Sequence, residues 1–364
     1  MIPIFKPIEV ERRYQKKSLR QIKKVVNSGV FIKGSSVTNF EKKLSAYLST
    51  EEVLGVNSGT DAIRLGLISL NVGKDDEVIV PSHTATATIS AIISVGAIPV
   101  FVDIEENTYL VDLTEASRLI TKKTKALIFV HIYGKTGNML TLLNFCQENN
   151  IYLIEDCAQA FGAEFQGQKI GTFGDVGCYS FYPTKNLGAI GDAGAVVSKH
   201  PDIMKDLREI SQYGWDQNRI SVSDGFNSRL DEIQAAVLLE KLNFIDEWNS
   251  RRIEIANKYS SELSMSFFEK PRSGAHFSHV FHLYVVRIDS INRESLIKYA
   301  RQRGVQLSIH YKIPNHLHPN FKRFQRGNNL SNTEIICKEI ISIPIYPNLR
   351  IKEINHVCAV LNDF

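Results

Sequence analysis

The chain has 364 residues, of which 43% are hydrophobic and 23% charged, an ordinary composition for a globular protein with a sizeable core. A formal net charge of +4 and a pI near 8.6 are too mild to indicate nucleic-acid binding. No apolar stretch reaches the length of a membrane span, and five cysteines without a C-x-x-C pair favour free thiols in a reducing compartment, so we expect a cytoplasmic protein.

The first predicted element is a basic helix at Glu11–Lys24, which we interpret as a solvated helix face. From about residue 53 to 200, short apolar runs then alternate with helical periods. The predicted strands are VLGV (53–56), EVIVP (77–81), IPVFVDI (98–104), ALIFVHI (126–132), IYLIED (151–156), CYSFY (178–182) and AGAVV (193–197). Strands that alternate with helices predict a mostly parallel sheet covered on both faces.

The last third of the chain has a different pattern. The amphipathic stretch 229–259 predicts one long helix that leads out of the first domain. HVFHLYVVRID, the helical ESLIKYARQRG and VQLSIHYK then indicate an α+β unit. We therefore predict an α/β fold with a large domain at residues 1–245 and a smaller C-terminal α+β domain at residues 246–364.

Two predicted segments carry polar groups to the sheet edge formed by the carboxyl ends of the strands, where open α/β sheets bind ligands. VNSGT is a turn into a helix, where Gly59 lets an anion approach the exposed N–H groups; a plain N-cap by Ser58 or Thr60 is an equal alternative. In IYLIEDCAQA, Asp156 ends a buried strand, where a charge needs a partner. Asp156 and Gln159 could face one ligand, and an N-cap on the following helix is the alternative.

A third segment places a lysine beyond the same edge. Ser180 and Lys185 lie where a strand runs into a glycine-rich turn. A buried lysine has a lowered pKa and can attack an aldehyde, although most lysines extend into water. An anion cradle, an acid suited to a pyridinium nitrogen and a lysine are the groups that hold pyridoxal 5′-phosphate. The lysine would condense with the aldehyde and later move a proton between substrate and cofactor carbons.

These segments also resemble the pyridoxal-phosphate-dependent nucleotide-sugar aminotransferases of the DegT/StrS type, which have the aspartate aminotransferase fold (fold type I). The matching stretches are VNSGTDAIRLGL, DEVIVPSHT, GAIPVFVDI, IEDCAQAFGAEF, GTFGDVGCYSFYPTKNLGAIGDAGAVV, GFNSRLDEIQAAVLLEKL and HLYVVR. The resemblance implies that Lys185 condenses with the cofactor, Asp156 contacts the pyridine nitrogen and Gln159 lies near the ring hydroxyl.

The same resemblance implies further contacts. Gly59, Thr60 and Ser180 are expected at the cofactor phosphate, together with Asn227 of the neighbouring subunit, so the active unit would be a homodimer. Arg229 is expected close by, where it could meet the carboxylate of the amino donor.

PSHT and SIHYK look most like the 3-aminotransferases of dTDP-3-keto-6-deoxyhexoses (FdtB/QdtB type). That implies L-glutamate as donor, a nucleotide-linked keto sugar as acceptor, and a product for a surface polysaccharide such as the O-antigen of lipopolysaccharide. Tyr182, His310 and Tyr311 would contact the sugar or its diphosphate. Where the family often has an aromatic residue that stacks on the cofactor ring, this chain has Ala85, and His83 is the expected substitute.

Other functions are less well supported. A dinucleotide oxidoreductase would need G-x-G-x-x-G after its first strand, and a P-loop at YGKTG would need a glycine in place of Phe129. A zinc site at His276, His279 and His282 is not favoured, because the segment continues as a strand. A catalytically silent regulator or scaffold on this fold stays open. Family members with histidine in place of the lysine are dehydratases; Lys185 favours transamination, and a C-4 aminotransferase of a dTDP- or UDP-4-keto sugar is the alternative.

Overall fold

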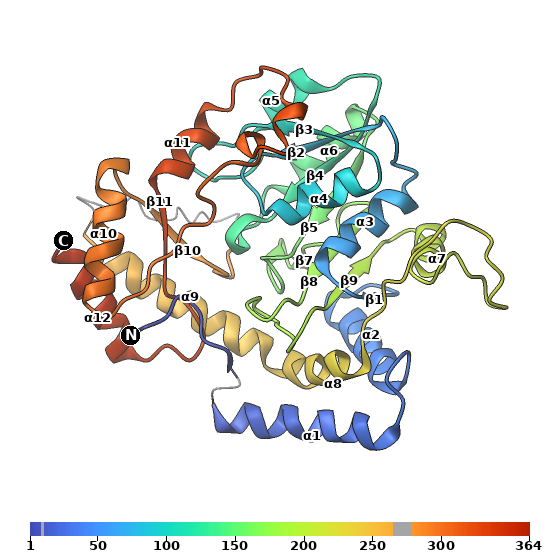
Figure 1. Ribbon diagram of the computed structural model, residues 1–364, viewed down its shortest axis with the longest axis horizontal. Helices are drawn as coiled ribbons and strands as arrows, with labels where there is room; N and C mark the ends of the chain where they lie inside the picture. The colour runs from blue at the N-terminus through green and yellow to red at the C-terminus, as the bar shows by residue number, and fades with distance from the viewer. Residues whose placement is uncertain (9–10, 265–277) are drawn as a thin grey trace.

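A computed structural model describes residues 1–8, 11–264 and 278–364 (Figure 1). Its centre is a seven-stranded sheet in the order β1-β9-β8-β5-β4-β2-β3. The strands are β1 (Leu54–Val56), β2 (Glu77–Pro81), β3 (Ile98–Val102), β4 (Thr124–Val130), β5 (Tyr152–Asp156), β8 (Val176–Ser180) and β9 (Gly194–Val197). β9 is antiparallel to both neighbours and the other neighbouring pairs are parallel, which confirms the predicted mostly parallel sheet.

Helices cover both faces of this sheet (Figure 1). They are α2 (Ser35–Leu48), α3 (Gly59–Ser69), α4 (Thr86–Ser94), α5 (Leu113–Leu119), α6 (Met139–Glu148), α7 (Pro201–Ile210) and α8 (Glu232–Lys241). The helix α1 (Arg12–Ser28) packs on the outside of α8. Side chains alternate across a strand, and β9 shows the consequence. Val196 packs in one core with α3, α4 and α6, whereas Ala195 and Val197 pack in a second core with α2 and α8.

A smaller unit contains α9 (Ile245–Glu262), α10 (Ser290–Gln302), α11 (Ser331–Glu339), α12 (Ile351–Asn362) and the antiparallel pair β10 (Tyr284–Arg287) and β11 (Ile340–Ile343). Its core also takes in Ile2, which pairs with Val305, so the start of the chain lies in this unit. The boundary near residue 246 coincides with the start of α9 and stays a prediction. A short hairpin, β6 (Glu164–Phe165) and β7 (Gln168–Lys169), lies outside both sheets.

The single helix predicted over residues 229–259 is wrong. A 3₁₀ turn, Leu242–Phe244, separates α8 from α9. The apolar spacing continues through Leu238, Leu242 and Ile245, all buried in one core, and the pattern therefore did not reveal the break. Within the described ranges, no helix combines the length and the apolar character that a membrane crossing requires.

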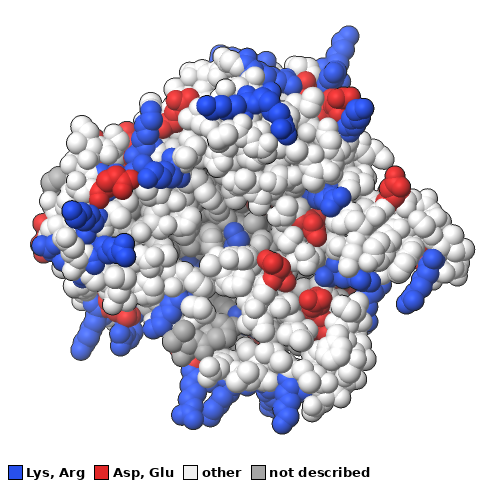
Figure 2. Space-filling view, viewed as in Figure 1, with Lys and Arg blue, Asp and Glu red and all other residues white. Residues whose placement is uncertain are grey.

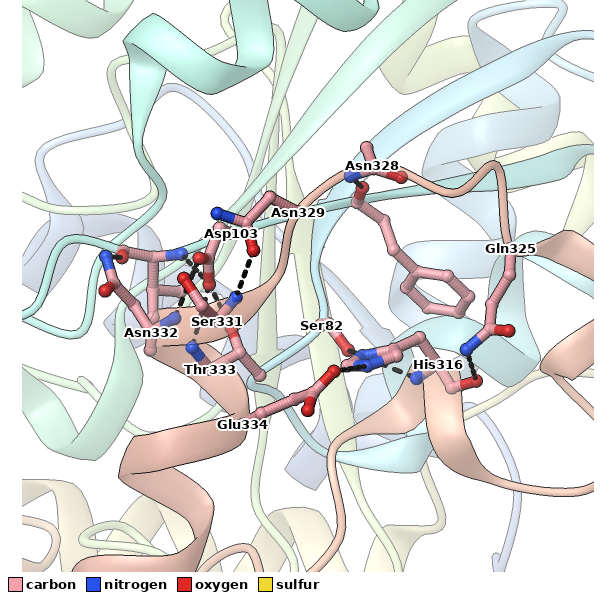
Figure 3. Close-up of polar contacts among 12 residues, drawn as sticks. Ser82, Asp103, His316, Gln325, Asn328, Asn329, Ser331, Asn332, Thr333 and Glu334 are labelled. Atoms are coloured by element: carbon pink, nitrogen blue, oxygen red, sulfur yellow. Dashed lines mark hydrogen bonds and ion pairs between the residues drawn. The ribbon is translucent and has the colours of Figure 1, made fainter.

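Residues 315–334 join the smaller unit to the carboxyl ends of β2 and β3 (Figure 3). Asp103, directly after β3, accepts hydrogen bonds from the Thr333 hydroxyl at 2.7 Å, the Thr333 N–H at 2.8 Å and the Asn332 N–H at 3.0 Å. Ser82, directly after β2, lies with its Oγ 2.7 Å from His316 Nδ1. Asp103, Thr333, Ser82 and His316 are all buried. Together these contacts fix the segment that follows the predicted sugar-contacting residues.

Candidate active site

The start of α3 is pressed against the ends of β8 and β9. A Cβ on Gly59 would lie 2.6 Å from Ser180 Cβ, closer than real Cβ atoms approach, so this packing requires the glycine. Ser58 caps α3, because its Oγ accepts the Asp61 N–H at 3.1 Å. The first N–H groups of a helix have no acceptor one turn back, which leaves those of Gly59 and Thr60 for a ligand. With Ser180 alongside, this helix start fits a phosphate.

Asp156 is buried at the end of β5 and is held by two donors. The Thr88 hydroxyl donates to its Oδ2 at 2.8 Å, and the Ala158 N–H donates to its Oδ1 at 3.1 Å. The carboxylate therefore has a fixed orientation at the sheet edge. Sequence reasoning missed Thr88, although TATAT, separated by two residues from a predicted strand, places several hydroxyls near that edge.

Lys185 lies in the turn after β8, where its backbone N–H donates to the Tyr182 carbonyl at 2.8 Å. Burial lowers the pKa of the Lys185 amine to about 8, and the Asp156 carboxylate opposes part of this effect. The two groups follow adjacent strands of the sheet, since Asp156 ends β5 and Lys185 lies in the turn after β8. In the view of Figure 1, the molecular surface is hollowed near its centre, and Lys or Arg atoms lie inside the hollow (Figure 2).

The turn that carries Lys185 is anchored by its next residue, Asn186, which is buried. The Asn186 amide donates to Asn249 Oδ1 at 2.8 Å and to the Val280 carbonyl at 3.2 Å. Its oxygen lies 3.2 Å from His282 Nδ1. The smaller unit thereby helps to hold the lysine turn, which the sequence pattern did not indicate.

Gln159 connects the sheet edge to the smaller unit. Its Oε1 accepts the Tyr133 N–H at 2.6 Å, and its Nε2 donates to the Tyr311 hydroxyl at 2.8 Å. Burial and the Asp156 charge raise the pKa of Tyr311, and burial and the Lys185 charge lower the pKa of His310. The structure thus brings His310 and Tyr311 to Lys185, Asp156 and Gln159.

Other predicted site residues do not join this group within one chain. The Tyr182 side chain is 51% exposed. Asn227 is exposed and Arg229 half-buried on the loop between α7 and α8. Arg229 lines a separate cavity of about 910 Å³ that also contains Lys33 and other cationic side chains. Ser228 ties this loop to α3 by a 2.8 Å hydrogen bond to Asp61.

His83, the expected substitute for a stacking aromatic, is buried and bonded at both ring nitrogens. Its Nε2 lies 2.6 Å from the Tyr133 hydroxyl, and its Nδ1 lies 3.4 Å from Cys337 Sγ. Its ring meets those of Tyr133 and Tyr311 edge-on. A cofactor contact by His83 stays a prediction, and Ala85 lies half-buried just before α4.

Of the three histidines considered for zinc, His276 lies outside the described residues. His279 stacks on Phe281 at a ring separation of 3.8 Å, and His282 faces Asn186.

A buried group of His131, Glu155 and Cys157 also has metal-ligating atoms close together. Glu155, however, already accepts the N–H groups of Gly171, Phe173 and Gly174 at 2.7–2.8 Å and lies 3.1 Å from His131 Nε2. These bonds occupy both carboxylate oxygens, so Glu155 anchors the loop at residues 171–174.

Comparisons with known proteins agree with this geometry. The model of the DegT/DnrJ/EryC1/StrS aminotransferase family matches residues 12–362. A dTDP-3-amino-3,6-dideoxy-alpha-D-galactopyranose transaminase from Aneurinibacillus thermoaerophilus is 37% identical over 364 residues, covering 100% of this chain and 99% of that protein.

Solved structures give the same result for the fold. DesV from S. venezuelae matches with a TM-score of 0.95 and 35% identity, covering 100% of this chain and 98% of that one. NtdA from Bacillus subtilis, solved with the bound cofactor PMP, matches with a TM-score of 0.90 and 30% identity over 96% of this chain and 81% of that one. The predicted α/β aminotransferase fold is therefore confirmed.

Proposed function

Since the chain belongs to the DegT/DnrJ/EryC1/StrS aminotransferase family, we propose that it moves an amino group from L-glutamate to the C-3 keto group of dTDP-3-keto-6-deoxy-D-hexose. The product would be a dTDP-3-amino-3,6-dideoxyhexose. Membership of the family establishes that the chain is a pyridoxal-phosphate-dependent nucleotide-sugar aminotransferase. The choice of C-3 and of dTDP is supported by the full-length relative that is named for such a sugar.

The residues at the sheet edge fit this cofactor and its chemistry. When bound, pyridoxal phosphate supplies an aldehyde that carries the amino group and a ring that accepts electrons from the substrate carbon. The α3 start and Ser180 would hold the phosphate, and Asp156, oriented by two donors, would face the ring nitrogen. Lys185 has a pKa of about 8, so near that pH it is present both as amine and as ammonium. It can therefore take up and return a proton within one turnover.

The test of the substrate is incubation with 3-keto and 4-keto dTDP sugars and glutamate, with the position of the new amine read by NMR. Amination at C-3 is expected, and amination at C-4 would favour the alternative on a 4-keto sugar. Lys185→Ala should abolish turnover, and borohydride should no longer trap the cofactor on the chain. Turnover that persists in this variant would refute the role of Lys185.

We further propose a homodimer in which Asn227 reaches the phosphate site of the neighbouring subunit and Arg229 meets the donor carboxylate. Asn227 is exposed and Arg229 half-buried, on a loop that also exposes Ile220 (60%) and Val222 (57%). Mixing Asn227→Ala with Lys185→Ala chains should then restore some activity through hybrid dimers. Activity no higher than in either parent would contradict a shared site.

We also propose that the enzyme acts in the cytoplasm, where its product would feed the synthesis of a surface polysaccharide such as an O-antigen. The five cysteines, which are free and buried, support a reducing compartment.

A further inference from the structure

Tyr133 lies just beyond the carboxyl end of β4, in the 3₁₀ turn Ile132–Gly134, and is 3% exposed. Its backbone has φ of 60°, the left-handed region that a bulky residue enters only when surrounding contacts hold it. A buried tyrosine held in this way, at the sheet edge that carries Asp156, indicates that the surrounding contacts of Tyr133 matter.

The hydrogen-bond directions at the Tyr133 hydroxyl follow from its partners. The hydroxyl donates to the His310 carbonyl, because a carbonyl oxygen only accepts. The Tyr133 oxygen therefore accepts from His83 Nε2, 2.6 Å away. His83 Nδ1 is then free of a proton and accepts from the Cys337 thiol, with Sγ 3.4 Å away. One arrangement of protons satisfies the whole series from Cys337 through His83 and Tyr133 to His310.

Burial keeps this arrangement in one protonation state. It lowers the pKa of His83 to about 4 and raises that of the Cys337 thiol to about 12. It also raises the pKa of Tyr133 above its ordinary value, so the hydroxyl stays a donor. The contact with His310 therefore persists across the neutral pH range.

The backbone of Tyr133 also helps to position Tyr311, the residue after His310. Its N–H donates to Gln159 Oε1 at 2.6 Å, and Gln159 Nε2 donates to the Tyr311 hydroxyl at 2.8 Å. Tyr133 thus holds His310 directly and Tyr311 through Gln159.

The chain beyond Tyr311 is also fixed. Asn315 donates to the Ser82 and Thr84 carbonyls at 3.1 and 2.7 Å, and His316 bonds to Ser82 (Figure 3). The segment after Tyr311 is therefore fixed there, and before it His310 Nδ1 lies 2.9 Å from Ser342 Oγ in β11. Between these two supports, the contacts of Tyr133 hold the His310 carbonyl and, through Gln159, the Tyr311 hydroxyl.

We propose that Tyr133 is a positioning residue that sets where His310 and Tyr311 lie relative to the sugar substrate, and that His83 and Cys337 act through it. The link to the sugar rests on the proposed function and on the sugar contacts that the family resemblance predicts for His310 and Tyr311. The clamp on His310 and Tyr311 is a property of the fold and can be tested separately.

The first test is amide hydrogen exchange in the holoenzyme. Tyr133→Phe removes only the hydroxyl and should speed exchange in peptides that cover residues 309–312 at least fivefold. The matched control is Tyr259→Phe, since Tyr259 is also buried and its hydroxyl donates to the Pro344 carbonyl at 2.8 Å, within the smaller unit. It should leave those peptides unchanged. Equal exchange in wild type and Tyr133→Phe would overturn the clamp.

The second test is kinetic, with the keto sugar that the wild-type enzyme converts. Tyr133→Phe should raise the sugar KM about tenfold while kcat falls less than threefold, because the hydroxyl contributes to placing the sugar before the reaction. Equal losses in Tyr133→Phe and Tyr259→Phe would reduce Tyr133 to a structural role and overturn the proposal. A wild-type enzyme that converts no keto sugar would refute the proposed function, and the exchange result would still decide the clamp.

A milder pair of variants covers the case in which Tyr133→Phe does not fold. Cys337→Ala removes the donor to His83 Nδ1, and Cys337→Ser keeps one. The alanine variant should show faster exchange at residues 309–312 and a higher sugar KM, each in the same direction as Tyr133→Phe, and the serine variant should recover towards wild type. No difference between the two would count against transmission through His83.

Discussion

The charged ammonium form of Lys185 should destabilise the cofactor-free protein at neutral pH, because the folded chain removes it from water. Lys185→Met should remove this desolvation cost. Burial lowers the pKa of Lys185 from 10.5 to about 8. Lys185 is half-buried, so at 1.36 kcal/mol per pKa unit the difference corresponds to at most about 3 kcal/mol of folding free energy. Because the unfolded chain binds the proton more tightly, the cost is complete below pH 8. It falls as the pH rises from about 8 to 10.5, and it vanishes above that range.

The assay is urea unfolding of cofactor-free wild type and Lys185→Met at pH 7 and pH 9.5. The variant should be more stable by at most about 3 kcal/mol at pH 7 and by about half as much at pH 9.5. Lys122→Met, at an exposed lysine, serves as the control and should change stability by less than about 0.5 kcal/mol at both pH values. Equal stability of wild type and Lys185→Met at pH 7, or a gain that does not change with pH, would refute the reasoning.

Two further substitutions test the groups that we propose to hold and orient the cofactor. Thr88→Val removes the 2.8 Å hydrogen bond to Asp156 and should lower kcat/KM about 10- to 100-fold, since a bond to a charged group contributes about 1.5–3 kcal/mol; Thr88→Ser should recover most of the loss, and full activity of the valine variant would contradict the role. Gly59→Ala places a Cβ 2.6 Å from Ser180 Cβ and should weaken cofactor binding at least tenfold in a spectroscopic titration. Gly73→Ala, whose Cβ would have its nearest contact at 3.8 Å, should bind normally, and equal affinities in both variants would refute the packing argument.

The strands of the central sheet, and the edge at which their carboxyl ends meet, were predictable because they follow from the local pattern of apolar residues. Apolar runs of strand length separated by helical periods favour a parallel sheet, and the carboxyl ends of parallel strands meet at one edge. Asp156 ends β5 and Lys185 lies in the turn after the neighbouring strand β8, as the pattern predicts. The break between α8 and α9 was not predictable, because the apolar spacing continues across it.

The contacts that orient these groups depend on residues far apart in the chain. Tyr133 and His83 follow predicted strands, and the edge rule applied to Asp156 could have marked them as candidates. It could not have shown that Tyr133 bonds to His310, 177 positions later in the chain. Such a partner is selected by packing of the smaller unit on the sheet, for which a single sequence contains no local signal.

The sequence by itself determined the chemistry available to this protein: an amine, a carboxylate and a helix start, each placed at the end of a strand or in the turn that follows one. Those placements are local, because the alternation of strand and helix sets where each loop falls. Only the tertiary structure decided how the groups are tuned and held. Desolvation of Lys185, the hydroxyl of Thr88 on Asp156 and the clamp of Tyr133 on His310 all arise where separate elements pack together and exclude water.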